Sequence, residues 1–75
     1  MISIEHKNAH GARSITAELR TAIETGRYLD GDQLPPERDL SDTYSASRNT
    51  IRKALNNLEE AGLVVRKVGS GTFVN

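Results

Sequence analysis

The segment from Ser47 to Gly62 has the features of a complete amphipathic helix, and it limits the possible folds more than any other part of the chain. Its apolar residues recur at the spacing i, i+3, i+4 and i+7: Ile51, Ala54, Leu55 and Leu58. That spacing places them on one side of a helix. Ser47 can cap the start, because its hydroxyl can accept a hydrogen bond from an exposed backbone amide, and Gly62 suits the position after a helix end. The pattern predicts a helix over 48–61 with one buried and one outward side.

An apolar stripe nearer the N-terminus predicts another helix. At the spacing i, i+4, i+7 and i+8 it consists of Ile15, Leu19, Ala22 and Ile23. The stripe predicts a helix over 12–25 that ends near Gly26. Residues 1–11 show no sustained periodicity, so we expect a flexible lead-in there and one domain over 12–75.

A pair of prolines predicts where a short middle helix begins. Pro35 and Pro36 block any helix upstream of them, but proline is favourable at the first helical position. We therefore expect a helix over 36–44, with Leu40 on its core side. Before the prolines, the Asp-Gly-Asp sequence at 30–32 predicts a turn.

The C-terminal segment predicts a β-hairpin. Residues 63–68 and 72–74 are rich in β-branched and aromatic side chains, and the Gly-Ser-Gly sequence at 69–71 predicts the reversal between them. The expected fold class is therefore α+β and mainly α, with three helices followed by a two-stranded hairpin.

Length and composition exclude several classes of function. A chain of 75 residues forms one small domain that buries only about 60% of its unfolded surface, which leaves no room for a deep substrate pocket. The chain has no cysteine and no apolar run long enough to cross a membrane. His6 and His10 lie in the lead-in, without further ligands at metal-binding spacing. We expect a cytoplasmic protein that is not an enzyme and needs no cofactor or metal.

Charges are divided unequally along the chain. The 10 Lys and Arg residues balance the 10 Asp and Glu residues. Residues 1–47 nevertheless carry a net charge of minus three, and residues 48–75 one of plus three. A dipolar molecule of this kind can present its basic face to phosphates while its acidic side stays in water. Ordinary charge mixing would give the same division. The placement of the basic residues on the predicted elements therefore has to distinguish a phosphate-binding face from ordinary charge mixing.

Up to its last turn, where Glu59 and Glu60 follow, the outward side of the 48–61 helix bears only side chains that can donate hydrogen bonds. On a helical wheel they are Arg48, Asn49, Thr50, Arg52, Lys53 and Asn56. Such a face suits the major groove of DNA, where Arg reads guanine, Asn reads adenine and the Thr methyl can contact thymine. A solvated face with ordinary salt pairs is the alternative, but Arg48 and Lys53 have no acidic residue four positions on. A protein-interaction adaptor is the other alternative, and it would offer exposed apolar anchors.

The tip of the predicted hairpin has small side chains and follows two basic residues. It consists of Gly69, Ser70 and Gly71. Small residues let the backbone approach the floor of the minor groove, while Arg66 and Lys67 meet phosphates. A plain turn that requires glycine explains the same tip, and both interpretations can hold together. The 48–61 helix and a wing over 66–72 would then fill two adjacent grooves of double-stranded DNA.

Five motifs in order resemble the DNA-binding domain of GntR-family transcriptional regulators over residues 12–74. They are Leu19-Arg20 with Ile23 and Gly26, then Gly31 to Leu40, Ser47 to Leu55, Gly62 to Val64, and Gly69 to Val74. The resemblance implies a winged helix-turn-helix fold and regulation of transcription, usually repression, by a homodimer on a palindromic operator. Full-length members continue into a C-terminal domain that dimerises and binds a small-molecule effector. The resemblance predicts that this domain is missing from the present chain.

The resemblance also implies DNA contacts for particular residues. It transfers such contacts to Arg38, Arg48, Asn49, Thr50 and Arg52, and a minor-groove role to Gly69 and Gly71. Arg38 rests on the resemblance alone. With the wheel and the hairpin tip, the expected DNA-binding set is Arg38, Arg48, Asn49, Thr50, Arg52, Lys53, Lys67, Gly69, Ser70 and Gly71. Pro36 stands where the family commonly has Ser or Ala, which puts a helix-cap contact in doubt.

Overall fold

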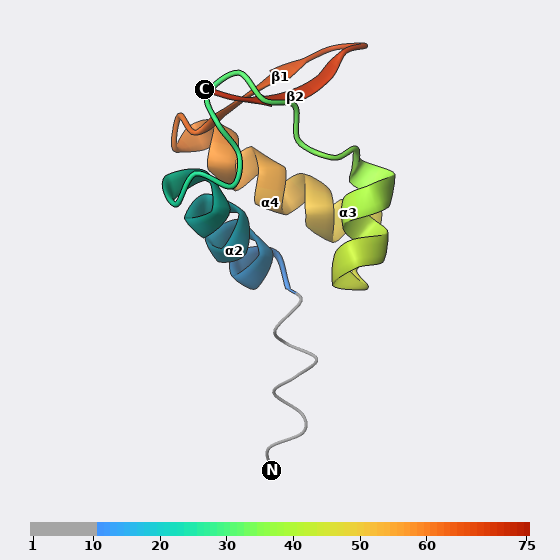
Figure 1. Ribbon diagram of the computed structural model, residues 1–75. Coiled ribbons are helices and arrows are strands. Elements are labelled where there is room, and N and C mark those ends of the chain that lie inside the picture. The colour runs from blue at the N-terminus through green and yellow to red at the C-terminus, as the bar shows by residue number, and fades with distance from the viewer. Residues whose placement is uncertain (1–10) are drawn as a thin grey trace.

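The computed structural model describes residues 11–75. Within these residues, three helices are followed by two strands (Figure 1): α2 (Ala12–Glu24), α3 (Glu37–Tyr44), α4 (Arg48–Glu60), β1 (Val64–Lys67) and β2 (Gly71–Val74). This order confirms the mainly helical α+β class, and each predicted element ends within one residue of its predicted bounds. The lead-in predicted at 1–11, with both histidines, lies outside the described residues except for Gly11.

One apolar core lies where α2 and α3 pack against α4 and the hairpin covers one end (Figure 1). Its buried members are Ile15, Leu19, Leu34, Leu40, Ile51, Ala54, Leu55, Leu58, Val64 and Val74. All of the stripe predicted on α4 is buried, whereas Ile23 of the α2 stripe is only half-buried at the edge of the core. Burial of the α4 stripe directs the opposite side of that helix away from the core.

Local backbone signals place the junction between α3 and α4. The Ser47 hydroxyl accepts a hydrogen bond from the Thr50 amide at 3.1 Å, which confirms the predicted cap of α4. Helix α3 begins at Glu37, one residue later than predicted, because Pro36 keeps an extended conformation with ψ at 162°. It ends at Tyr44 and is followed by Ser45, a non-glycine residue in the left-handed region at φ 51°. A short turn therefore joins the two helices.

The segment before α3 lies along the free edge of β2, which the sequence did not predict. Gln33 forms an isolated antiparallel bridge with Phe73, and the Leu34 amide donates to the Thr72 carbonyl at 2.8 Å. The predicted turn at 30–32 is present, because the Asp32 carboxylate accepts from the Leu29 amide at 2.8 Å. The antiparallel hairpin thus gains a third extended segment along β2, which connects the start of α3 to the wing.

Candidate nucleic-acid interface

The outward side of α4 carries most of the residues predicted to contact DNA. Arg48, Asn49, Arg52 and Lys53 are exposed. Thr50 is half-buried, and its hydroxyl lies 2.9 Å from the Ser47 hydroxyl. That contact occupies the Thr50 hydroxyl at the helix cap, so its methyl group is the part left for a base. Arg38 is exposed on α3, the helix that precedes α4.

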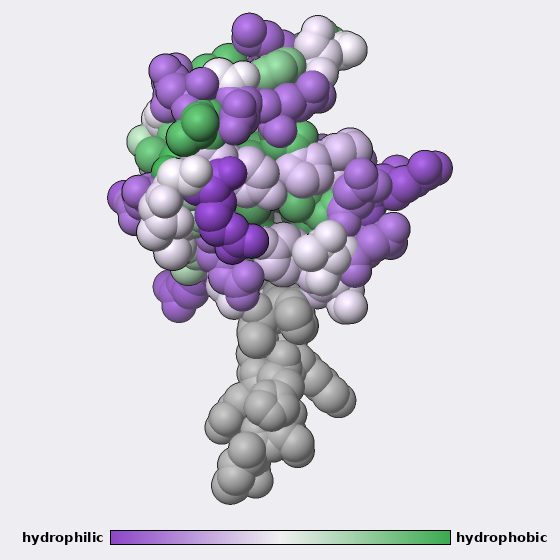
Figure 2. Space-filling model, in the orientation of Figure 1, coloured by the Kyte–Doolittle hydropathy of each residue, from purple (hydrophilic) through white to green (hydrophobic). Residues whose placement is uncertain are grey.

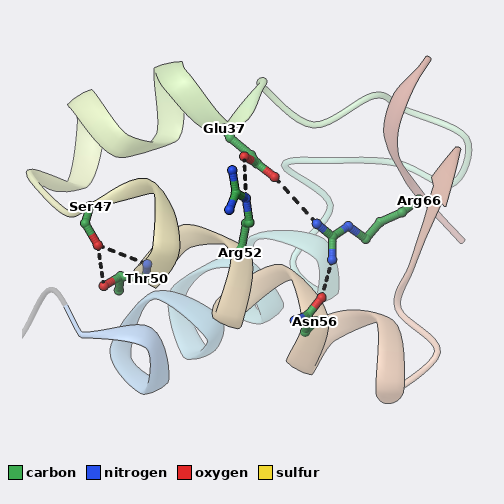
Figure 3. Close-up of polar contacts among 6 residues, drawn as sticks. All are labelled: Glu37, Ser47, Thr50, Arg52, Asn56 and Arg66. Carbon is green, nitrogen blue, oxygen red and sulfur yellow. Dashed lines mark hydrogen bonds and ion pairs between the residues drawn. The ribbon is translucent and has the colours of Figure 1, made fainter. Parts of the chain in front are cut away.

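A carboxylate from α3 reaches this basic surface. Glu37, at the first position of α3, accepts a hydrogen bond through Oε1 from Arg52 Nε at 3.2 Å (Figure 3). Its second oxygen, Oε2, lies 3.5 Å from Nη2 of Arg66 on β1. The other terminal nitrogen of Arg66 donates to Asn56 Oδ1 on α4. These four residues, here called the Glu37 cluster, join α3, α4 and β1.

The Glu37 cluster bears on two expectations drawn from the sequence. Arg66 was expected to meet phosphates, but its side chain lies between Glu37 and Asn56 and is only 28% exposed. Asn56 is expected as a hydrogen-bond donor of α4; its carbonyl oxygen accepts from Arg66, and its amide nitrogen makes no hydrogen bond within residues 11–75. The absence of acidic partners within α4 was read correctly for Arg48 and Lys53, because the ion pairs within residues 11–75 involve other basic residues. The carboxylate that pairs with α4 belongs to Glu37 of α3.

The wing tip is held by the segment before α3. Gly69 and Gly71 both adopt positive φ, at 79° and 124°, which any other residue would adopt only with strain. The Gln33 side chain donates to the Ser70 carbonyl at 3.0 Å, and a Cβ at Gly71 would lie 2.4 Å from Gln33 Nε2. The Lys67 ammonium lies 4.9 Å from the centroid of the Phe73 ring. The tip residues are exposed; both glycines serve the turn, and Gly71 also allows the close approach of Gln33.

Apolar surface is scarce on the described residues. Figure 2 shows one face of the molecule, on which hydrophilic side chains predominate and apolar ones form small separate areas. The large apolar residues exposed within 11–75 are Leu29, Val65 and Val68, which come from a loop and the wing. None of these exposed residues lies on α4, so its outward side within the described structure lacks the apolar anchors that an adaptor surface would use.

The part of the chain that the structure describes shows no metal-binding arrangement and no membrane-spanning helix. Residues 11–75 contain no group of three or more His, Cys, Asp or Glu side chains placed to hold a metal ion. No helix among them is both long and apolar enough to cross a membrane.

Comparisons with known sequences place the chain in one family of bacterial proteins. The model of the family described as bacterial regulatory proteins, gntR family, matches residues 12–74. The HTH-type transcriptional regulator GgaR of Escherichia coli is 46% identical over 57 residues, which are 76% of this chain and 23% of that protein. The HTH-type transcriptional repressor NagR of Bacillus subtilis is 41% identical over 61 residues, 81% of this chain and 25% of that protein. The chain thus spans about a quarter of the length of these relatives.

Solved structures agree with the sequence comparisons. The DNA-binding domain of AraR, in complex with an operator, aligns with a TM-score of 0.84 at 34% identity, covering 85% of this chain and 77% of that one. The possible transcriptional regulator YydK from Bacillus subtilis aligns with a TM-score of 0.78 at 36% identity, covering 84% of this chain and 28% of that one. The three helices and hairpin are therefore the winged helix of these proteins, and the chain belongs to the gntR family of bacterial regulatory proteins.

Proposed function

We propose that the domain over residues 12–75 binds double-stranded DNA sequence-specifically as part of a transcriptional regulator. The observation that carries the proposal is the exposed basic side of α4, which begins at a helix N-terminus and continues over the first two turns. The AraR domain, similar in fold and sequence, is bound to an operator in its solved complex. In our proposal α4 enters the major groove and the wing meets the adjacent minor groove.

The chemistry of α4 suits base recognition near its N-terminus. Arg48 and Arg52 can read guanine and Asn49 can read adenine, while the Thr50 methyl can contact a thymine methyl. Glu59 and Glu60 come only in the last turn of α4, beyond the part that would enter the groove first. Repulsion between these carboxylates and phosphates would therefore stay small.

The remaining predicted contacts would position the domain on the duplex. We assign phosphate contacts to the exposed Arg38, Lys53 and Lys67, because the attraction of cationic side chains to phosphates does not depend on sequence. We assign the minor-groove approach to the tip residues Gly69, Ser70 and Gly71, whose side chains leave the backbone accessible.

We further propose that the regulator is longer than this domain and acts as a homodimer on a palindromic operator in the bacterial cytoplasm. Relatives in which the matched segment makes up only about a quarter of the length support a further domain, to which we assign dimerisation and the binding of a small-molecule effector. The repressor name of NagR supports repression. Because each bidentate Arg–guanine pair discriminates by only about 1–3 kcal/mol, one copy should bind weakly and two copies on half-sites one helical turn apart should bind well.

Selection from random duplexes tests the proposal without knowledge of the operator. The wild-type domain should enrich one sequence, and fluorescence anisotropy should then show tighter binding to that duplex than to a scrambled one. We expect Arg48→Ala to weaken binding to the selected duplex by about 1–3 kcal/mol. Arg20→Ala on α2 removes the same charge at a side chain paired with Glu24 and is the matched control. Failure to enrich any sequence, or equal losses in both variants, would contradict the proposal and favour an adaptor.

A further inference from the structure

We propose that Glu37 is a positioning residue for DNA recognition, which orients Arg52 on α4 and Arg66 on β1 so that recognition helix and wing are presented in a fixed relation. The inference rests on the proposed function and deepens it. Glu37 itself need not touch DNA. It acts through the two guanidinium groups that its two oxygens hold.

The contact with Glu37 leaves the terminal nitrogens of Arg52 available for a base. Glu37 accepts from Nε of Arg52, the nitrogen nearest the aliphatic stem (Figure 3). The two terminal nitrogens of Arg52 make no hydrogen bond within residues 11–75. A bidentate contact with guanine needs two donors of the guanidinium pointing the same way. The Arg52 side chain is 56% exposed, so that edge is open to a ligand. A carboxylate on Nε would therefore fix the plane of the group without blocking it.

The same carboxylate connects the wing to the recognition helix. Arg66 contacts Glu37 through one terminal nitrogen and Asn56 through the other. Asn56 lies one helical turn beyond Arg52 on α4, so the cluster closes a path from α3 through β1 back to α4. Glu37 and Arg66 are 31% and 28% exposed, which makes this pair better shielded from water than Arg52. The cluster thus restrains the angle at which the hairpin leaves α4.

A carboxylate at this place has opposite effects on affinity and specificity. Its charge repels the phosphates of every DNA sequence alike, because the backbone term is independent of sequence. Its ordering of Arg52 benefits only the sequence that the ordered guanidinium fits, since a side chain already held in place loses less freedom on binding. Half-exposed ion pairs contribute little to folding stability, so these recognition effects should dominate in a variant.

The test compares Glu37→Ala with Asp39→Ala in the wild-type domain. Asp39 is exposed in the same first turn of α3 and makes no ion pair or side-chain hydrogen bond within residues 11–75. Both variants remove one negative charge from the start of α3, so both should bind a scrambled duplex somewhat more tightly. Only Glu37→Ala should lower the ratio of affinities for the selected and scrambled duplexes, by at least about fivefold.

Two further readouts separate positioning from a merely structural role. Glu37→Ala should lower specificity less in the Arg52→Ala background than in the wild type, because only the part of its effect that passes through Arg66 then remains. By NMR, the Nε–H proton of Arg52 should exchange slowly with water in the wild type and fast in Glu37→Ala, with or without DNA. Glu37→Gln, which keeps the side-chain shape, replaces the alanine variant if that variant proves too unstable to measure. Its specificity should be lower than that of the wild type.

The outcomes are distinct. Specificity that is unchanged or raised in Glu37→Ala would overturn the inference while leaving DNA binding intact, and a raised value would make Glu37 a competitor of DNA for Arg52. Equal specificity losses in Glu37→Ala and Asp39→Ala would also overturn it. A wild-type domain that enriches no sequence would refute the proposed function, and the reading role with it, while the Arg52 exchange rate would still decide whether Glu37 holds that side chain.

Discussion

Replacing Gly71 by alanine tests the link between the wing and the segment before α3. Gly71 adopts φ 124°, and a Cβ built there would lie 2.4 Å from the Gln33 side-chain nitrogen. A non-glycine residue held in such a conformation carries a strain of about 1–3 kcal/mol. The Gln33 side-chain amide is flexible and can move away, but it then loses its 3.0 Å hydrogen bond to the Ser70 carbonyl. This exposed hydrogen bond contributes about 1 kcal/mol.

These two terms add to a destabilisation of about 2–4 kcal/mol. For a domain of this size, each kcal/mol corresponds to a fall in Tm of about 4–8 °C. Thermal and urea unfolding followed by circular dichroism would measure the change. Gly69→Ala is the matched control, because Gly69 also has positive φ, at 79°, but a Cβ there would meet nothing within 4 Å.

The contact with Gln33 can be isolated by a double-mutant cycle. Gln33→Ala removes the atom that the new methyl group would meet, so Gly71→Ala should destabilise the Gln33→Ala domain less than it destabilises the wild type. A Gly71→Ala variant no less stable than Gly69→Ala, or a cycle with no coupling, would show that the wing does not rest on Gln33 as described.

Three other predictions address the core, the cap of α4 and the behaviour at high pH. Leu55→Ala, at a side chain 2% exposed, should reduce the free energy of unfolding by about 2–5 kcal/mol, and an unchanged urea midpoint would contradict the core assignment. Ser47→Ala should cost about 1 kcal/mol, because Thr50 loses the acceptor of its amide, whereas Ser47→Asp should retain most of the stability. The Tyr44 pKa is raised above its ordinary 10.0, first by burial and then by the charge of Glu18. The stability that this shift contributes is complete below pH 10 and is lost as the pH rises through the raised pKa. Because the charge of Glu18 contributes to the rise, Glu18→Gln should lower the Tyr44 pKa measured by phenolate absorbance titration.

Much of the candidate site follows from the sequence because it lies on one helix. The positions of Arg48, Asn49 and Lys53 on the outward side of α4 follow from the helical period and from the buried stripe opposite them. Their exposure agrees with that prediction, and their contacts with DNA remain proposals. Arg38 came only from the family resemblance, since nothing in the local sequence distinguishes it from other surface residues.

Glu37 is the residue that sequence reasoning missed as part of the site. Its place in the first turn of α3 explains it as a favourable charge at a helix N-terminus, and that explanation needs no partner. Its ion pairs reach Arg52, 15 residues away, and Arg66 on a different element. No spacing rule within a helix or strand predicts contacts at such separations.

The sequence by itself determined the helices, the hairpin and the side of α4 that faces outward, because periodic apolar residues, a capping serine and turn glycines act within a few positions along the chain. Only the tertiary structure decided that residues 31–34 line β2 and that a carboxylate from α3 joins two arginines from other elements. Packing α2 and α3 against α4 sets the distances between segments far apart in sequence. Pairwise contacts of that kind exist only once the core has formed.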